Sequence, residues 1–296
     1  MDKKDLSHVL GPWPTKTHLN PMIIESIDCG SYIRQKVEYQ SEVNDKIPAY
    51  VLIPKHLQSP APVIFCHHQH GGNFALGKSE VVGLAGDPDQ SYAVELAQRG
   101  YITFAPDAIA FEERNWTEDK SGKAEYFELA TRLIQGQTLL AKVLHDISVG
   151  IDYLENRPDV DKNRIGFIGH SYGGKMAIWA PAFDKRIKVS VSNCGCVNYK
   201  NSLSRDLGIQ MEFCVPNIMQ YGDIGNIVKL VAPTPLYISA ADNDKYSKGA
   251  QELYNYAKSA FKNSELKLKL WPEGHVFTKP MREEAYLFLD TYLKKD

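Results

Sequence analysis

A single serine stands between glycines in the stretch GHSYGG (169–174), where Gly169 and Gly173 flank Ser171 at a distance of two residues. A run of β-forming residues precedes this stretch, and a helical pattern begins at Tyr172. In a sharp turn from strand to helix the serine backbone is strained, and glycines on either side avoid collisions with neighbouring segments. We therefore expect Ser171 to be a nucleophile, rather than part of an ordinary glycine-rich turn.

A serine hydroxyl reacts only when a base takes its proton. Among nine histidines, His275 lies in a short loop between the last predicted strand, 265–271, and the last predicted helix, 283–293. This loop reaches the same edge of the sheet as Ser171, so His275 is the expected general base. His170, beside the serine, is expected to point away from the reaction as a packing residue.

The base needs a carboxylate that fixes its tautomer and stabilises its positive charge. Asp242 and Asp244 follow the predicted strand 235–241, again at its carboxyl end. Asp244 is the preferred acid, because it stands three residues beyond the small residue Ala241, where the strand ends. Asp242 is the alternative acid, and whichever of the two is not used is expected to be a solvated loop residue.

Negative charge on an attacked carbonyl oxygen needs two backbone N–H donors. One is expected to be the N–H of Tyr172, directly after the nucleophile. The other is expected from Gln69 or His70, in the loop HHQHGGN (67–73) that follows the predicted strand 62–68. Both residues remain candidates for this second donor.

The same loop raises the alternative of a metal site, since it holds three histidines: His67, His68 and His70. His68 and His70 could share one face of a strand, but no carboxylate stands beside them at ligand spacing. Cys194 and Cys196 also lack a second Cys/His pair nearby. We therefore expect neither a metal ion nor any other cofactor.

Strands and helices alternate along most of the chain, and continuous apolar runs of β-formers indicate strands buried on both faces. The predicted strands are 62–68, 101–107, 164–169, 188–194, 235–241 and 265–271, and the predicted helices are 91–100, 139–156, 172–180, 247–261 and 283–293. This alternation favours an α/β fold, with a mostly parallel central sheet and helices on both faces. Segments 110–136 and 197–230 do not fit it and are expected to be short insertions, or lids, over the carboxyl edge of the sheet.

The N-terminal region has a different pattern. Residues 1–30 are expected to be irregular, because three prolines break any helix there. Two β-prone runs, 32–39 and 48–54, predict a hairpin. We expect residues 1–45 to be an extension packed on the core and residues 46–296 to be the main domain.

Composition narrows the classes of function. The 296 residues carry 34 basic and 36 acidic side chains, which leaves no electrostatic footprint for nucleic acid. No stretch approaches the ~18 apolar residues of a membrane span. Five cysteines without small-scaffold spacing indicate free thiols, and the polar start lacks the apolar region of a secretion signal. The sequence therefore predicts a cytoplasmic protein with no nucleic-acid or membrane partner.

Several motifs together resemble one family: GHSYGG, ISAADND, PEGHVF, HHQHGGN and ELAQRGYITFAPD. They are similar to motifs of the dienelactone hydrolase and acetyl-xylan-esterase-like branch of the α/β-hydrolases, over roughly residues 48–293, and the chain order serine, aspartate, histidine also matches. The resemblance implies the α/β-hydrolase fold and hydrolysis of carboxylic esters through an acyl-enzyme, without a cofactor. Dienelactone hydrolases proper use a cysteine nucleophile where this chain has Ser171, so their lactone substrate does not carry over.

The expected function is therefore that of a serine esterase with a small-molecule ester substrate. One rival is a hydrolase of small acyl-peptides or amides of the prolyl-oligopeptidase type, although only about 45 residues precede the core, too few for the propeller of those enzymes. The other rival is a non-catalytic binding protein on a hydrolase scaffold, against which the complete candidate triad argues. A homo-oligomer is left open.

Overall fold

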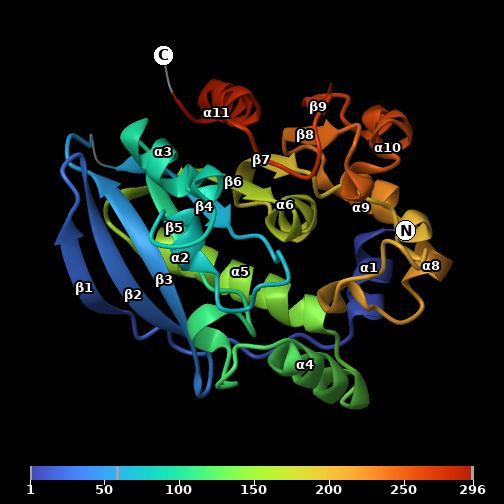
Figure 1. Ribbon diagram of the computed structural model, residues 1–296, viewed down its shortest axis with the longest axis horizontal. Helices are drawn as coiled ribbons and strands as arrows, with labels where there is room; N and C mark the ends of the chain where they lie inside the picture. The colour runs from blue at the N-terminus through green and yellow to red at the C-terminus, as the bar shows by residue number, and fades with distance from the viewer. Residues whose placement is uncertain (1, 58–59, 295–296) are drawn as a thin grey trace.

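The computed structural model describes residues 2–57 and 60–294 of the chain. Within these residues nine strands form one sheet, in the order β1-β2-β3-β5-β4-β6-β7-β8-β9 (Figure 1). The strands are β1 (Met22–Asp28), β2 (Tyr32–Glu42), β3 (Asp45–Pro54), β4 (Ala61–His67), β5 (Ile102–Pro106), β6 (Val160–His170), β7 (Ile187–Asn193), β8 (Leu236–Ala241) and β9 (Leu266–Trp271). Strands β1, β2 and β3 are antiparallel to their neighbours, and β4 to β9 are parallel. The expected α/β-hydrolase fold with a mostly parallel sheet is confirmed.

Helices cover both faces of this sheet. The α-helices of the described residues are α1 (Lys3–Leu10), α2 (Lys78–Val81), α3 (Tyr92–Gln98), α4 (Lys123–Ile134), α5 (Leu139–Glu155), α6 (Tyr172–Phe183), α7 (Tyr199–Ser202), α8 (Ile218–Tyr221), α9 (Ile224–Val231), α10 (Ala250–Ala257) and α11 (Lys279–Leu293). Short 3-10 turns are η1 (Pro88–Gln90), η2 (Glu112–Arg114), η3 (Met211–Phe213), η4 (Lys245–Ser247) and η5 (Lys258–Ala260). None of these helices is long and apolar enough to cross a bilayer.

Alternate residues of a strand point to opposite faces, so a strand covered on both sides is apolar throughout. In β4, Val63 and Phe65 join the core shared with α5, α6, α9 and α10. The residues between and after them, Ile64 and Cys66, join the core shared with α3 and α11. These two buried layers explain why the predicted parallel strands agree with the observed ones to within a few residues.

The expectation that residues 1–30 are irregular was wrong, because α1 and β1 both lie there. The prolines fall outside both elements. A capping box at Asp2 starts α1, and the helix buries Leu6 and Leu10 in the main core. Strand β1 is an edge strand whose side chains are almost all exposed, so its sequence, MIIESID, lacks the alternation of apolar and polar residues that marks a half-buried strand.

The division of the chain at residue 45 stays a prediction. Strands β2 and β3 pair with each other across it, from Tyr32 opposite Pro54 to Glu42 opposite Asp45. Residues 1, 58, 59, 295 and 296 of the predicted domains lie outside the described residues.

The two segments that interrupt the alternation hold short helices. Segment 110–136 contains η2 and α4, and segment 197–230 contains α7, η3, α8 and most of α9. The 3-10 turn η3 contacts both α4 and α5, so the two insertions meet beside α5. In Figure 1, α4 lies below α5, and α8 lies next to α1.

Candidate active site

Ser171 lies at the turn between β6 and α6, which is the setting expected for a nucleophile. Its φ of +56° and ψ of −111° are unusual for a residue with a side chain, which indicates a strained backbone. A hydrogen bond of 2.9 Å from the Ser171 N–H to the carbonyl oxygen of Asn193, at the end of β7, stabilises this strained conformation. Ser171 remains 9% exposed.

The flanking glycines are required by close backbone approaches. A Cβ atom on Gly169 would lie 2.3 Å from the carbonyl carbon of Gly173, and a Cβ atom on Gly173 would lie 2.0 Å from the carbonyl oxygen of His67. A Cβ atom on Gly174 would lie 2.3 Å from the carbonyl oxygen of Asn193. The main chains of β4 and β7 therefore pack directly against the first turn of α6, and side chains cannot fit between them.

His275 and Asp244 lie together at the carboxyl edge of the sheet. The Nδ1 atom of His275 is 3.0 Å from Oδ1 of Asp244. This contact has the distance of an ion pair but not the angle of a straight hydrogen bond. The Asp244 side chain is fully buried, whereas that of His275 is 28% exposed and can reach a substrate.

The Asp244 carboxylate is stabilised by several donors. It accepts hydrogen bonds from the backbone N–H of Tyr246 at 2.9 Å and from the hydroxyl of Ser247 at 2.7 Å. Burial opposes ionisation, but His275 and these donors outweigh it and hold the pKa of Asp244 below its ordinary value. Asp244 is therefore suited to keep a negative charge beside the histidine.

Asp242 has a different environment. Its side chain is exposed, and its backbone N–H pairs with the carbonyl oxygen of Trp271. Among the described residues no ion pair or hydrogen bond joins its carboxylate to His275. The geometry thus brings Asp244, and not Asp242, to the histidine.

The candidate oxyanion donors lie at the start of α6 and in the loop after β4, two segments whose main chains pack together at Gly173 and His67. The Tyr172 N–H belongs to the first turn of α6, where N–H groups have no partner within the helix. On the other side, the Gln69 carbonyl oxygen lies 2.7 Å from Nδ1 of His68. In the described part of the chain, no acceptor is recorded for the backbone N–H of Gln69 or of His70. Both residues therefore stay candidates for the second donor.

The ring nitrogens of His67 and His68 contact backbone groups. Nδ1 of His67 lies 3.0 Å from the His68 carbonyl oxygen, and Nε2 of His68 accepts a hydrogen bond from the N–H of Ala108 at 3.0 Å. Burial lowers the pKa of His67 to about 3 and that of His68 to about 4, so both rings are neutral. These two histidines act as buried links between the oxyanion loop and its surroundings.

His70 meets two glutamates that are distant in sequence. Its Nε2 lies 2.9 Å from Oε1 of Glu125 in α4, and a carboxylate oxygen of Glu212 in η3 lies within 4.8 Å of a ring nitrogen of His70 and of a carboxylate oxygen of Glu125. The N–H of Gly72 donates to Nδ1 of His70 at 3.0 Å, so the ring proton is on Nε2 and is donated to Glu125. A metal ligand at Nε2 would carry its proton on Nδ1, so this tautomer fits a hydrogen-bond donor better than a metal ligand.

Sequence reasoning missed two ionisable groups near the site, Glu212, which is buried, and Lys175, which is half-buried. Burial and the nearby Glu125 raise the pKa of Glu212 to about 8, and neither of its carboxyl oxygens has a hydrogen-bond partner of good geometry in the described chain. Burial lowers the pKa of Lys175 to about 8, against the attraction of Glu212 and Asp244. The Lys175 ammonium donates to the side chain of Gln210 at 2.5 Å. Only its position one helical turn after Ser171 could have drawn attention to Lys175.

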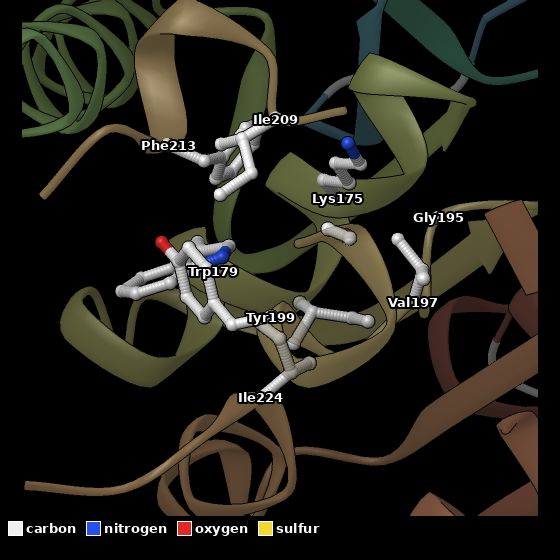
Figure 2. A pocket seen from close by; sticks show the side chains of 10 residues that line it. Lys175, Trp179, Gly195, Val197, Tyr199, Ile209, Phe213 and Ile224 are labelled. Carbon is white, nitrogen blue, oxygen red and sulfur yellow. The ribbon is translucent and has the colours of Figure 1, made fainter. Parts of the chain in front are cut away.

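A small pocket lies beside Lys175 and α6 (Figure 2). Trp179 and Tyr199 line it together with Ile209 and Phe213, and Lys175 and Gly195 lie at its other end. Its volume is about 20 Å³, which leaves room for a group near the size of a water molecule. The walls are mainly apolar and come from α6 and from the insertion 197–230.

His170 is a packing residue, as expected, but it packs on the base instead of pointing away. The centres of the His170 and His275 rings are 4.7 Å apart. Burial, with a smaller effect of His275, lowers the pKa of His170 to about 3. His170 is therefore a neutral ring against which His275 rests.

Comparison of the chain with known protein families defines its class. The chain belongs to the dienelactone hydrolase family, whose family model matches residues 47–294. This membership confirms the expected fold and the expected kind of enzyme, a hydrolase of carboxylic esters.

Individual relatives are distant. The Bacillus subtilis (strain 168) protein YtaP is 28% identical over 313 residues, which cover 98% of each chain. The carbohydrate esterase MZ0003, from an unknown prokaryotic organism, is 28% identical over 159 residues, covering 45% of this chain and 36% of its own length. A glucuronoyl esterase from Solibacter usitatus is 19% identical, with a TM-score of 0.66 over 98% of this chain and 94% of its own. Acetyl xylan esterase 1 from Thermoanaerobacterium sp. JW/SL YS485 is 14% identical, with a TM-score of 0.62 over 100% and 99%. The two structures share the fold of this chain.

Proposed function

We propose that the protein hydrolyses carboxylic esters through an acyl-enzyme formed on Ser171, with His275 as general base and Asp244 as the acid of the triad. The observation that carries this proposal is the contact of His275 with a buried, stabilised Asp244 at the edge of the sheet where Ser171 is held in a strained turn. A negative Asp244 favours the charged form of the histidine, which must appear when the serine loses its proton.

The reaction proceeds in two transfers. The Ser171 oxygen attacks the ester carbonyl carbon while His275 accepts the serine proton, and the negative charge moves to the carbonyl oxygen. The N–H groups of Tyr172 and of Gln69 or His70 stabilise that charge. The negative charge on the carbonyl oxygen then re-forms the C=O double bond, and the bond between the carbonyl carbon and the alcohol oxygen breaks. His275 gives its proton to the leaving alcohol. Water then repeats the sequence on the acyl-enzyme, with His275 again as base, and releases the acid and the free serine.

The substrate we propose is an ester of a short acyl group, carried by a sugar or a similar polar alcohol. Two relatives by fold or sequence are named as esterases of xylan or of carbohydrate, which supports a polar alcohol. We take the pocket beside α6 as the acyl site because Lys175, one helical turn after Ser171, lines it, and its volume of about 20 Å³ suits a small acyl group. Cytoplasmic location also stays a proposal.

A panel of p-nitrophenyl esters from acetate to decanoate, run beside acetylated sugars, tests the substrate. We expect kcat/KM to be highest for acetate and to fall by about tenfold or more toward decanoate, because each unaccommodated methylene loses binding in the transition state. Aminoacyl anilides in the same panel separate an esterase from a peptidase of the prolyl-oligopeptidase type. Faster turnover of decanoate, or of the anilides, would contradict the proposed substrate, and no turnover of any compound would favour a binding protein.

A further inference from the structure

Asn193, the last residue of β7, connects the two halves of the candidate site. Its side chain and backbone are fully buried. Its carbonyl oxygen accepts the 2.9 Å hydrogen bond from the N–H of Ser171. Its side-chain Nδ2 lies 3.0 Å from the carbonyl oxygen of Val276, the residue after His275. One residue therefore contacts both the strained turn of the nucleophile and the loop that carries the base.

The orientation of the Asn193 amide follows from its partners. A carbonyl oxygen can only accept, so the amide nitrogen must face Val276. The second N–H of the same group then points to Nδ1 of His170, at 2.8 Å. Nδ1 of His170 accepts this bond, so the His170 proton resides on Nε2, in agreement with a neutral ring whose pKa is lowered to about 3.

The Asn193 side chain thereby fixes the position of two groups that contact His275 or its loop. One is the carbonyl of Val276, which sets where the loop 272–277 runs. The other is the His170 ring, whose centre is 4.7 Å from that of His275 and which also stacks on Phe277 at 6.0 Å. No other described side chain bonds to both. The sulfur of Cys194 also approaches the Val276 oxygen at 3.8 Å, a weaker contact.

We propose that Asn193 is a positioning residue that keeps His275 in register with Ser171. It holds the nucleophile's turn through its backbone and the base's loop through its side chain, and it does not touch the substrate. This inference rests on the proposed roles of Ser171 and His275. A displacement of the base of about 1 Å is enough to reduce catalysis by about 100-fold while substrate binding is kept.

The test is the Asn193→Asp variant, which has nearly the same shape but cannot donate to Val276 or to His170. Asn193→Ala, which removes both donors without adding a charge, is made beside it in case a buried aspartate prevents folding. For p-nitrophenyl acetate we expect kcat to fall by about 100-fold in either variant, with KM changed less than about threefold. The rate at which a fluorophosphonate labels Ser171 should fall by a similar factor, because the labelling also needs an aligned base.

Ser190→Ala is the matched control. Ser190 lies in the same strand, is equally buried, and donates a 2.5 Å hydrogen bond to the carbonyl oxygen of Ala177, remote from the histidine loop. Loss of this single hydrogen bond should leave kcat within about twofold. A purely structural Asn193 would resemble this control, so an Asn193→Ala variant that keeps kcat within threefold overturns the inference.

Failure of the inference and failure of the proposed function give different results. If the wild type turns over esters and is labelled on Ser171 while the Asn193 variants behave in the same way, only the role of Asn193 is wrong. If the wild type itself is neither labelled nor active, the proposed function is wrong, whatever the variants do.

Discussion

At the scale of residues, two aspartates that stand two positions apart have opposite surroundings. The carboxylate of Asp244 is buried beside His275 and accepts two further hydrogen bonds, whereas Asp242 is exposed. A charge in a buried, hydrogen-bonded setting acts on a neighbouring imidazolium far more strongly than one in water. The local sequence favours Asp244 through its position after Ala241, but it cannot show the difference in burial, since both residues follow the same strand.

Replacing each aspartate with asparagine distinguishes them by experiment. We expect Asp244→Asn to lower kcat by about 10³-fold or more, because asparagine no longer favours the required tautomer and charge of His275. The matched Asp242→Asn variant should keep kcat within about twofold. Steady-state hydrolysis of p-nitrophenyl acetate measures both, and a larger loss in the Asp242 variant would reverse the assignment.

Glu212 should make folding stability depend on pH. The unfolded chain releases this proton near the ordinary value of 4.5, whereas the folded protein keeps it to about pH 8. The proton therefore contributes stability fully below pH 4.5, and the contribution is lost as the pH rises to about 8. Glu212→Gln is neutral throughout, so relative to the wild type it should gain about 3 kcal/mol in the free energy of unfolding between pH 5 and pH 8.

Urea unfolding at both pH values measures this gain. The exposed Glu118→Gln variant is the control and should show no such change. An equal difference between Glu212→Gln and the wild type at pH 5 and pH 8 would mean that Glu212 is ionised in the folded protein across this range.

The residues that sequence reasoning identified share one property, namely a local motif or a position directly after a predicted strand. Ser171, His275 and Asp244 all have it. Asn193, Glu212 and Lys175 do not, because their surroundings are made by segments far apart in sequence. Glu212, for example, meets His70 and Glu125 only when both insertions fold against the oxyanion loop.

At the scale of elements, the strand-to-helix turn around Ser171 depends on backbone contacts between β4, β7 and α6. The parallel strands could be predicted because burial on both faces makes them apolar throughout. Helix α1 and strand β1 could not, since one depends on a cap before a short helix and the other is an exposed edge. Within the insertions, short helices such as α7 and α8 are too brief to show a period.

Gly173→Ala tests the backbone contact at this turn. The added methyl would lie 2.0 Å from the His67 carbonyl oxygen, so β4 and α6 must separate. We expect a loss of about 3 kcal/mol or more, or failure to fold. Gly274→Ala is the control, because its position has open space and no positive φ. Thermal unfolding compares the two, and equal melting temperatures would show that the contact is not as tight as described.

At the scale of the whole molecule, helix α1 packs against the main core and contacts the insertion 197–230. Leu6 and Leu10 are fully buried in the main core, the carbonyl oxygen of Leu10 accepts a hydrogen bond from Thr138, and α1 contacts α8. The N-terminal residues are therefore expected to support the segment 197–230, which forms much of the pocket beside α6.

The Leu10→Ala variant tests whether α1 contributes to the stability of the fold. Removing a buried leucine side chain costs about 2–5 kcal/mol, or about 5–10 °C in the melting temperature of a domain of this size. His8→Ala, on the exposed side of the same helix, should cost less than about 0.5 kcal/mol. Differential scanning calorimetry measures both, and equal effects would mean that α1 is not part of the cooperative fold.

The central claim is that Ser171 is the nucleophile and that the fold activates it. The most direct measurement is to treat the purified protein with a fluorophosphonate and to map the adduct by mass spectrometry. We expect one adduct, on the peptide that contains Ser171, with loss of esterase activity in step with labelling and neither labelling nor turnover in Ser171→Ala. An adduct on another residue, or full turnover by Ser171→Ala, would contradict the claim.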